Sequence, residues 1–381
     1  MQIPPALRAA LESEAARFRL AELSAALARL SESYRSGIAP QRLSDVERAA
    51  YAVARMPATY AACRAALAAV VPRVEAAAEG EGADAGSDGG EGEHGGIASL
   101  LDLGAGLGSG LWAAAEAIPS LKKATLCDAD AGMIQLGRVL AASADQAVVR
   151  DAAWRLMDFG LGMGADMGGV SAGKHGAGAK FERHDLVTCS YSLGELEPER
   201  AEQALRAAWD ATGKVLVVIE PGTVAGFARI RRWRELLLAP GNTNGAQLMG
   251  GAHMAAPCPH AQACPMAGPT SGPTSGPTSG NDWCHFAQRV ERSSLHRRLK
   301  GGTLGYEDEK FSYIAVSRLP VALPEARIIR HPQVEPGVIR LELCAADGLR
   351  AAVVRKKDRE RFRRARRAAW GGVWEETSGD S

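Results

Sequence analysis

The chain is poor in aromatic residues and lacks any apolar run long enough to cross a membrane. Phe, Trp and Tyr together make up only 5% of its 381 residues. A membrane helix needs an apolar stretch of about 18 residues or more, so we expect no membrane association. A dominant charge is also missing, because 45 basic and 44 acidic residues leave a net charge of +1. A balanced total implies no class of partner by itself, although local segments are still charged.

The N-terminus lacks the pattern of a secretory signal. Its acidic residues Glu12, Glu14 and Glu22 also distinguish it from an acid-poor transit peptide. Seven cysteines in such a chain indicate a reducing compartment, where clustered cysteines bind metal more often than they form disulfides. We therefore expect a bacterial cytoplasmic protein that acts as a monomer. Its length is sufficient for one large domain with appendages, or for two domains.

Residues 98–112 have the pattern of a strand, a glycine turn and a helix. A short apolar run ends at Asp102, Gly104, Gly106 and Gly108 follow, and an alanine-rich helix is predicted after them. This arrangement brings bare backbone N–H groups close to a nucleotide-like ligand. The third glycine comes one residue earlier than in the dinucleotide fingerprint. The resulting Asp-x-Gly-x-Gly-x-Gly resembles motif I of the class I S-adenosylmethionine (SAM) methyltransferases, whose carboxylate faces the methionyl end of SAM.

Residues that follow the later strands are further candidates for binding the same ligand. Asp128 lies 24 residues after Gly104, about where nucleotide-binding folds place an acid that accepts the ribose hydroxyls. The alternative is a helix cap, a role that we assign to Asp130. Asp158, after a third strand, is a candidate for the adenine end. Ser190 ends a fourth strand, whose carboxyl end should lie beside the glycine loop at the switch point of the sheet.

Strands alternate with helices from about residue 97 onward, which predicts a parallel, doubly wound α/β sheet. Residues before it are helical in composition, with a break expected at Pro57. The predicted fold is therefore a Rossmann-like class I methyltransferase sheet with an N-terminal helical region and a metal-binding cysteine insertion. The expected segments are a helical region 1–78, an acidic glycine-rich linker 79–96, a SAM-binding core 97–240, a cysteine-rich insertion 241–310, C-terminal strands completing the sheet 311–354 and a basic tail 355–381.

The most specific pattern of the chain is a group of cysteines in its second half. Cys258 and Cys264 precede three Gly-Pro-Thr-Ser repeats at 268–279, and Cys284 follows them, so the pattern without the repeats is Cys-x5-Cys-x7-Cys. Cys344, at the end of a predicted strand, is the candidate for a fourth ligand. Four thiolates suit either zinc or an iron–sulfur cluster. The tight cysteine pairs usual for zinc are absent, and the wide spacing with Cys-Pro dipeptides favours a [4Fe–4S] cluster.

Other assignments for the cysteines stay open. His260 or His285 could replace one of the thiolates, and the four cysteines could also carry no metal. Cys63, Cys127 and Cys189 lack this clustering and are expected to be core thiols. A methyl-accepting nucleophile is the alternative for Cys189, but a buried structural thiol fits its place inside a strand better.

The cysteine segment continues through Asp-Trp-Cys-His-Phe286 to Tyr306-Glu-Asp-Glu-Lys-Phe-Ser-Tyr313. With further matches at 54–60, 190–196 and 220–223, it resembles the Rsm family. These are the methyltransferase-like proteins of the mitochondrial ribosomal small subunit and their bacterial relatives, and the likeness covers about residues 44–375. It implies a class I methyltransferase fold acting on the small ribosomal subunit during assembly. It also implies a [4Fe–4S] cluster on Cys258, Cys264, Cys284 and Cys344.

The residues contain a pattern for SAM binding but none for the catalytic step. Ser190-Tyr-Ser-Leu193 lacks the Asn-Pro-Pro-Tyr box of amino-methylating enzymes. No residue is therefore assigned as a general base. Three functions are compatible with the sequence. The first is SAM-dependent methylation of small-subunit rRNA, and the second is non-catalytic RNA binding during assembly, with zinc in place of the cluster. Redox or iron sensing through the cluster is compatible with either.

Two basic segments are candidates for contact with rRNA. Residues 355–367 hold nine basic and two acidic side chains. A solvated helix of mixed charge is the simpler interpretation, but neutralisation of phosphates accounts better for the excess of positive charge. A second basic patch at residues 289–300 adjoins Cys284 and consists of Arg289, Arg292, Arg297, Arg298 and Lys300.

Overall fold

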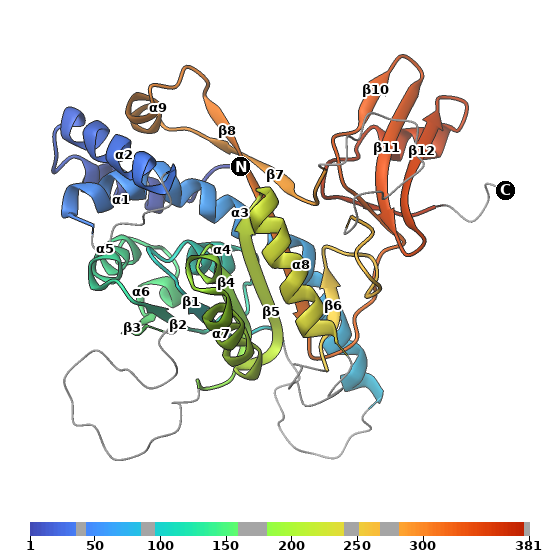
Figure 1. The fold of residues 1–381 in the computed structure, drawn as a ribbon, viewed down its shortest axis with the longest axis horizontal. Coiled ribbons are helices and arrows are strands. Elements are labelled where there is room, and N and C mark those ends of the chain that lie inside the picture. Colours follow the sequence, from blue (N-terminus) through green and yellow to red (C-terminus); the bar gives the residue numbers. More distant parts are fainter. Residues whose placement is uncertain (36–42, 85–95, 159–180, 240–250, 267–281, 377–381) are drawn as a thin grey trace. The chain divides into compact units, whose positions relative to one another are not determined.

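The structure, a computed structural model, describes residues 1–35, 43–84, 96–158, 181–239, 251–266 and 282–376 (Figure 1). The chain divides into two compact units. Unit 1 consists of residues 1–68, 96–216 and 288–309, and unit 2 of residues 69–95, 217–287 and 310–381. None of the helices in the described ranges is both long enough and apolar enough to span a membrane.

The N-terminal region is helical, as its composition predicts. It contains α1 (Pro5–Ala15), α2 (Leu20–Arg35) and α3 (Asp45–Asp84). The break expected at Pro57 is wrong, because α3 continues through this residue. Met56 and Ala58 on either side of it are at most 1% exposed. Burial of these neighbours stabilises the helix enough to outweigh the backbone hydrogen bond that proline removes.

The first strands of the central sheet are doubly wound in the order β3-β2-β1-β4-β5, as predicted, and the first four are parallel. The sheet as a whole is mixed, because two of its later strands pair antiparallel. Strand β1 pairs in parallel with both β2 and β4, and β2 pairs in parallel with β3. The order reverses at β1, which makes the carboxyl ends of β1 and β4 the switch point of the sheet. The strands are β1 (Ser99–Leu103), β2 (Lys123–Asp128), β3 (Ala153–Leu156), β4 (His184–Ser190) and β5 (Thr212–Pro221).

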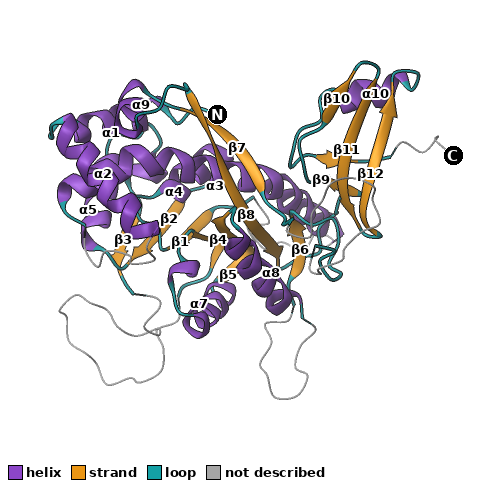
Figure 2. Cartoon of the chain, turned by 45° about the horizontal axis from the view of Figure 1, so that its top comes forward, coloured by secondary structure: helices purple, strands orange, loops and turns teal. Residues whose placement is uncertain are grey.

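Helices separate β1 from β2, β2 from β3, and β4 from β5 along the chain (Figure 2). The glycine loop leads directly from β1 into the first of them. These helices are α4 (Ser109–Ala117), α5 (Ala131–Ala141), α6 (Ala147–Arg150) and α7 (Pro198–Asp210), with a short 3-10 turn at Leu193–Glu195. Unit 1 also contains α9 (Ser294–Lys300), whose Leu299 packs in one apolar cluster with Leu23 of α2.

Unit 2 contains the C-terminal part of α3 and the end of β5, which is followed by α8 (Val224–Leu238). The Thr223 hydroxyl accepts a hydrogen bond from the Gly226 N–H at 3.0 Å, which confirms the predicted cap of this helix. Strands β6 (His253–Ala256), β7 (Phe286–Glu291) and β8 (Tyr306–Ser317) follow. The order here is β5-β8-β6, in which β6 and β8 are antiparallel, and β7 pairs with β8.

The C-terminal part of unit 2 forms a second, antiparallel sheet. Of residues 311–354, expected to complete the first sheet, only those in β8 join it. The others pair in the order β10-β11-β9-β13, with β12 beside β11. Short turns between successive strands favour antiparallel pairing, because a parallel return needs a crossover connection. The elements are β9 (Ala326–Ile328), β10 (Gln333–Glu335), β11 (Val338–Ala345), β12 (Gly348–Arg355), α10 (Arg359–Ala365) and β13 (Val373–Trp374).

Candidate functional site

The glycine loop between β1 and α4 has the backbone that close approach to a ligand requires. Gly104, Gly106 and Gly108 have φ values of +71°, +54° and +83°, a region that side chains other than glycine rarely adopt. A Cβ atom at Gly108 would lie 2.9 Å from the Trp154 ring, so a side chain has no room there. The Gly104 N–H donates a hydrogen bond of 2.8 Å to the Cys127 carbonyl. The loop is thus held against the end of β2.

Asp102, the carboxylate before the glycines, is 1% exposed. It accepts a hydrogen bond of 2.7 Å from the Thr188 hydroxyl, on the neighbouring strand β4. Burial raises the pKa of Asp102 to about 7, although the Thr188 hydroxyl partly opposes the shift. A Cβ atom at Gly110 would lie 2.6 Å from this carboxylate, so glycine is required at the first turn of α4. The carboxyl group therefore lies enclosed beneath the loop.

The sequence left two roles open for Asp128, ligand binding and capping of the next helix, and the structure assigns the cap to Asp130. The Oδ2 atom of Asp128 accepts a hydrogen bond of 2.7 Å from the Gly106 N–H, and its Oδ1 atom accepts one from the Asp130 N–H at 2.9 Å. Burial raises its pKa. Asp130 caps α5, because its side chain accepts hydrogen bonds from the N–H groups of Gly132 and Met133. Asp128 is thus hydrogen-bonded to the glycine loop, and the predicted capping role of Asp130 is confirmed.

Ser190 ends β4 and contacts α3. Its hydroxyl accepts a hydrogen bond of 3.3 Å from the Cys63 thiol. Tyr191 follows with φ of +59°, the only non-glycine residue of positive φ in the described ranges. Its hydroxyl donates to Glu309 at 3.0 Å, and Arg55 lies 3.4 Å from the same carboxylate. The sequence did not predict these three residues, because their spacing along the chain gives no sign that they meet.

The predicted SAM-binding residues all belong to unit 1. They lie at the carboxyl ends of β1, β2 and β4, apart from Asp158, which comes two residues after β3 and is half-buried. Hydrogen bonds connect Asp128 to the glycine loop and Asp102 to β4. The structure therefore brings together the candidates at β1 and β2 most closely. The roles of all these residues toward a ligand remain predictions.

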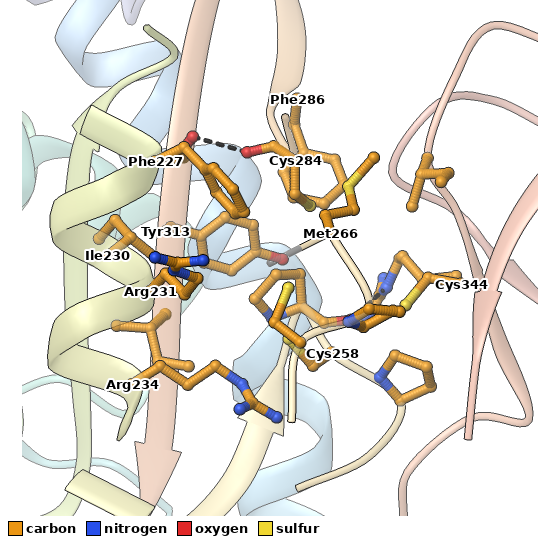
Figure 3. Close-up of a pocket in the computed structure, with 18 of the residues that line it drawn as sticks. Phe227, Ile230, Arg231, Arg234, Cys258, Met266, Cys284, Phe286, Tyr313 and Cys344 are labelled. Atoms are coloured by element: carbon orange, nitrogen blue, oxygen red, sulfur yellow. Dashed lines mark hydrogen bonds between the residues drawn. The ribbon is translucent and has the colours of Figure 1, made fainter. Parts of the chain in front are cut away.

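The four clustered cysteines line one pocket in unit 2 (Figure 3). They reach it from separate segments, since Cys258 and Cys264 follow β6, Cys284 precedes β7, and Cys344 lies on β11. The Cys284 carbonyl accepts a hydrogen bond of 2.8 Å from the Ser312 hydroxyl. Apolar and basic side chains complete the wall, among them Phe227, Ile230, Phe286, Tyr313, Arg231, Arg234 and Arg327.

Burial raises the pKa of three thiols of this pocket, those of Cys264, Cys284 and Cys344. It raises the pKa of Cys284 well above its ordinary value, and the three other cysteines raise it further. Burial also raises the pKa of Cys344 to about 12, partly opposed by the positive charges of Arg234 and Arg327. Within the described residues, no three His, Cys, Asp or Glu side chains are grouped closely enough to hold a single metal ion. Whether the cysteines bind metal remains a prediction.

The two candidate histidine ligands differ in position. His260 lines the pocket, and its Nε2 atom lies 3.7 Å from the Cys344 sulfur. Its Nδ1 atom is buried and has no hydrogen-bond partner among the described residues. His285 is not part of the pocket wall, and its ring stacks against Trp283 at 5.0 Å between centroids. Only His260 is therefore placed to contact a group held by the cysteines.

The two basic segments have different surroundings. In the segment 289–300, Arg289 forms two hydrogen bonds with Asp308, of 2.8 and 3.0 Å. Arg292 and Lys300 each lie 2.8 Å from Glu307. The acidic side chains of β8 therefore neutralise much of the positive charge of this patch. In the segment 355–367, by contrast, most of the basic side chains are exposed to solvent, namely Arg355, Lys356, Lys357, Arg359, Arg363, Arg366 and Arg367.

The family model described as mitochondrial small ribosomal subunit Rsm22 matches residues 96–375. The chain belongs to this family. The match includes the glycine loop, the four cysteines and the whole basic segment 355–367. It therefore confirms the resemblance that the cysteine segment carries.

Two curated relatives support this membership. The ribosome assembly protein METTL17, mitochondrial, of Homo sapiens is 27% identical over 287 residues, which are 72% of this chain and 55% of that protein. The Rsm22-cox11 tandem protein 1, mitochondrial, of Schizosaccharomyces pombe is 30% identical over 223 residues, 51% of this chain and 29% of that protein. The chain thus spans about half or less of the length of these relatives. Because both are mitochondrial proteins, the expected bacterial cytoplasmic location is wrong.

Solved methyltransferase structures show limited similarity to this Rsm22-family chain. Magnesium protoporphyrin IX methyltransferase of Synechocystis, with bound SAM, is 12% identical, with a TM-score of 0.30. The match covers 64% of this chain and 77% of that chain. The Rossmann-like assignment made above rests on the strand order and on the switch point at β1.

Proposed function

We propose that this Rsm22-family protein binds SAM at its glycine loop and acts on the mitochondrial small ribosomal subunit during assembly. The hydrogen bond between Asp128 and the Gly106 N–H is the observation that supports SAM binding most directly. It places the second-strand acid against the loop that would receive the ligand. The human relative is named as a ribosome assembly protein, which supports the choice of partner.

The residues at the strand ends fit SAM in their chemistry. Asp102 supplies a buried carboxylate for the cationic methionyl end, beside the bare backbone of Gly104, Gly106 and Gly108. Asp128 would accept the ribose hydroxyls, since a carboxylate has lone pairs beyond the two that already accept backbone N–H groups. Asp158 and Ser190 are the proposed contacts at the adenine end and at the end of β4. The sulfonium of SAM, when bound, supplies the methyl group.

For the cysteine pocket we propose a [4Fe–4S] cluster on Cys258, Cys264, Cys284 and Cys344. Four thiols in one buried, partly apolar wall fit the donor set of such a cluster. A cluster is larger than one ion, so its thiolates need not converge on a single point. The alternative, zinc, requires four sulfur atoms at about 2.3 Å from one centre. The cluster, when bound, would connect three separate segments of unit 2 and supply a redox-active group.

The exposed basic segment 355–367 is the proposed contact with small-subunit rRNA. Its charge is available for phosphates, whereas much of the 289–300 patch is already neutralised by β8. Lysine and arginine contacts to phosphate release counterions, which supports binding without base recognition. We propose that the protein acts as a monomer on the subunit and that the 289–300 patch contributes less.

A second function, non-catalytic RNA binding during assembly, is supported by the end of β4. The Tyr191 hydroxyl is held by Glu309, and the Asn-Pro-Pro-Tyr box is absent from this position. A chain of this kind would use the methyltransferase fold as a scaffold, with or without bound SAM. Redox sensing through the cluster remains compatible with either function.

Methyl transfer from labelled SAM to immature small subunits separates the two functions. Label in rRNA that disappears in an Asp102→Ala variant supports catalysis. Tight SAM binding without transfer, together with association of the protein with the subunit, supports the scaffold. Failure of SAM to bind at any concentration tested would exclude the first function. Anaerobic purification with iron, sulfide and zinc analysis tests the metal centre in the same preparation.

A further inference from the structure

The geometry of the cysteine pocket points to Arg234 and Arg327 as the charges that compensate its four thiolates and set the reduction potential of the bound cluster. This inference rests on the proposed iron–sulfur centre. It concerns two residues that contact the backbone of the cysteine segments rather than the metal itself. They are therefore positioning residues and not ligands.

Both arginines are buried, and neither has a carboxylate partner in the part of the chain that the structure describes. Their exposed fractions are 5% for Arg234 and 3% for Arg327. Their hydrogen bonds within the described residues go to backbone carbonyls alone. One nitrogen of each guanidinium, Nε of Arg234 and Nη2 of Arg327, is buried without a hydrogen-bond partner in the described part of the chain. A buried, unpaired cation is strongly unfavourable. The pocket that both arginines line therefore favours an anionic occupant.

Arg327 is directly opposite one of the cysteines in the sheet. In the antiparallel pairing of β9 with β11, Arg327 is the Cα partner of Cys344. Side chains of directly opposite residues lie on the same face of a sheet, which brings the guanidinium and the thiol to the same pocket. The Nε atom of Arg327 donates a hydrogen bond of 2.8 Å to the Pro257 carbonyl, next to Cys258. One side chain thus connects two of the cysteine segments.

Arg234 holds the chain between the first two cysteines. It extends from α8 toward the cysteine side of the pocket (Figure 3). Its Nη2 atom donates hydrogen bonds to the His260 carbonyl, at 3.0 Å, and to the Gln262 carbonyl, at 2.5 Å. Both carbonyls lie between Cys258 and Cys264. The guanidinium therefore fixes this loop and keeps its positive charge beside it.

A third arginine provides an internal comparison. Arg330 donates a hydrogen bond of 3.1 Å to the Trp283 carbonyl, adjacent to Cys284. Its guanidinium also forms an ion pair with Asp282. The charge of Arg330 is therefore already balanced inside the protein. Of these three arginines, Arg330 has a carboxylate partner among the described residues, whereas Arg234 and Arg327 do not.

A metal centre bound by the four thiolates would carry the negative charge that Arg234 and Arg327 compensate. Four thiolates around a doubly charged centre form a dianion, whether the centre is zinc or an oxidised [4Fe–4S] core. One-electron reduction of the cluster adds a further negative charge. Nearby cations in a buried, low-dielectric site favour the more negative state and so raise the reduction potential. Removal of either positive charge should lower it.

The test compares Arg234→Gln and Arg234→Lys in anaerobically purified, full-length protein. Glutamine keeps a hydrogen-bond donor for the carbonyls but removes the charge, whereas lysine keeps the charge and loses the planar fork. Arg232→Gln, an exposed position on the same helix, is the matched control. The same pair of variants at Arg327 provides the second position. The readouts are iron and sulfide content and an electrode-controlled redox titration followed by visible absorption and electron paramagnetic resonance.

We expect Arg234→Gln to lower the reduced-to-oxidised ratio at a fixed potential by tenfold or more, a shift of about 59 mV for a one-electron couple. Arg234→Lys and Arg232→Gln should stay within threefold of the wild type. Equal effects of Gln and Lys, or no effect of either, overturn the inference. Loss of the cluster from the Gln variant alone supports it, and loss from both overturns it. Wild-type protein without iron overturns the proposed cluster instead, and zinc affinity of the same variants then replaces the potential as the readout.

Discussion

The carboxylate of Asp128 and the backbone N–H of Gly106 are joined by a hydrogen bond of 2.7 Å. The bond connects the end of β2 to the loop that follows β1. A side chain proposed to bind the ribose therefore also fixes the backbone proposed to face the methionyl group. The two halves of the proposed SAM site are coupled through this contact.

Replacement of Asp128 by alanine should weaken SAM binding by roughly tenfold or more. Hydrogen bonds to charged groups are worth about 1.5–3 kcal/mol each, and the variant loses the one that orders Gly106 along with any to the ribose. Isothermal titration calorimetry measures the change in affinity. Asp130→Ala is the control, since it removes only the α5 cap, costs about 1 kcal/mol of stability and should leave SAM affinity within threefold. Equal affinities of wild type and the Asp128 variant would contradict the prediction.

Gly108→Ala should destabilise the fold by about 1–3 kcal/mol. The residue has φ of +83°, and a Cβ atom there would lie 2.9 Å from the Trp154 ring. Urea denaturation measures the change in free energy of unfolding. The control is Gly305→Ala, where a Cβ atom would meet no other atom within 4 Å. If both substitutions have the same small effect, the loop is not constrained as described.

The buried carboxyl group of Asp102 should make stability depend on pH. Its pKa is raised from 3.8 to about 7, so between these values the folded state binds a proton that the unfolded state has released. The free energy of unfolding should therefore fall as pH rises from about 4 to about 7, by up to about 1.4 kcal/mol per pH unit, and the contribution is constant above that range.

Asp102→Asn, which cannot ionise, isolates this contribution. The difference in unfolding free energy between the variant and the wild type, measured without SAM, should increase over this pH range in favour of the variant. Urea titrations at pH 4, 5.5, 7 and 8 would show it. A difference that is independent of pH would mean that the Asp102 carboxyl group ionises in its ordinary range.

Cys344→Ser should abolish loading of the cysteine pocket, because it removes one of four proposed thiolate ligands. Iron and sulfide, about four of each per chain in the wild type, should disappear together with the visible absorption of the cluster. Cys127→Ser is a matched control, since Cys127 is a fully buried cysteine in the core of unit 1. Retention of iron and sulfide in the Cys344 variant would remove this residue from the ligand set.

The exposed basic segment should dominate the salt dependence of RNA binding. Lys356→Gln combined with Lys357→Gln should reduce the slope of log K against log salt by about 0.7–0.9 for each phosphate that is no longer neutralised. Arg289→Gln should change it less, because Asp308 already pairs with this arginine. Fluorescence anisotropy with a small-subunit rRNA fragment measures both slopes. A larger effect of the Arg289 variant would assign the RNA-binding role to the 289–300 patch.

Much of the sheet in unit 1 could be predicted from the sequence, because its information is local. Apolar runs of strand length, each followed by a glycine, an acid or a capping residue, mark β1, β2, β4 and β5. The capping role of Asp130 follows from its position one residue before α5. Pro57 misled the prediction, since the burial that keeps α3 continuous comes from residues distant in the chain.

The surroundings of the cysteines could be predicted only in part. The spacing of Cys258, Cys264 and Cys284 indicated that they belong together, and Cys344 was the candidate fourth ligand because it ends a predicted strand. Arg234 and Arg327 carried no such signal, because an arginine on an amphipathic helix or a short strand is ordinarily a surface residue. Arg327 is buried on β9 opposite Cys344 of β11, and Arg234 is buried against the loop between Cys258 and Cys264, so both depend on contacts between segments that are separate in the sequence.

The register of β9 against β11 makes the pocket an all-or-none assembly. Successive side chains of a strand point to opposite faces, so a slip of one residue would separate Arg327 from its place opposite Cys344. The Arg327 guanidinium and the Cys344 thiol therefore reach the pocket together only in the correct register. Metal would bind only to chains in which the antiparallel sheet has paired in the correct register. Bound metal would therefore indicate that the C-terminal part of the protein is folded.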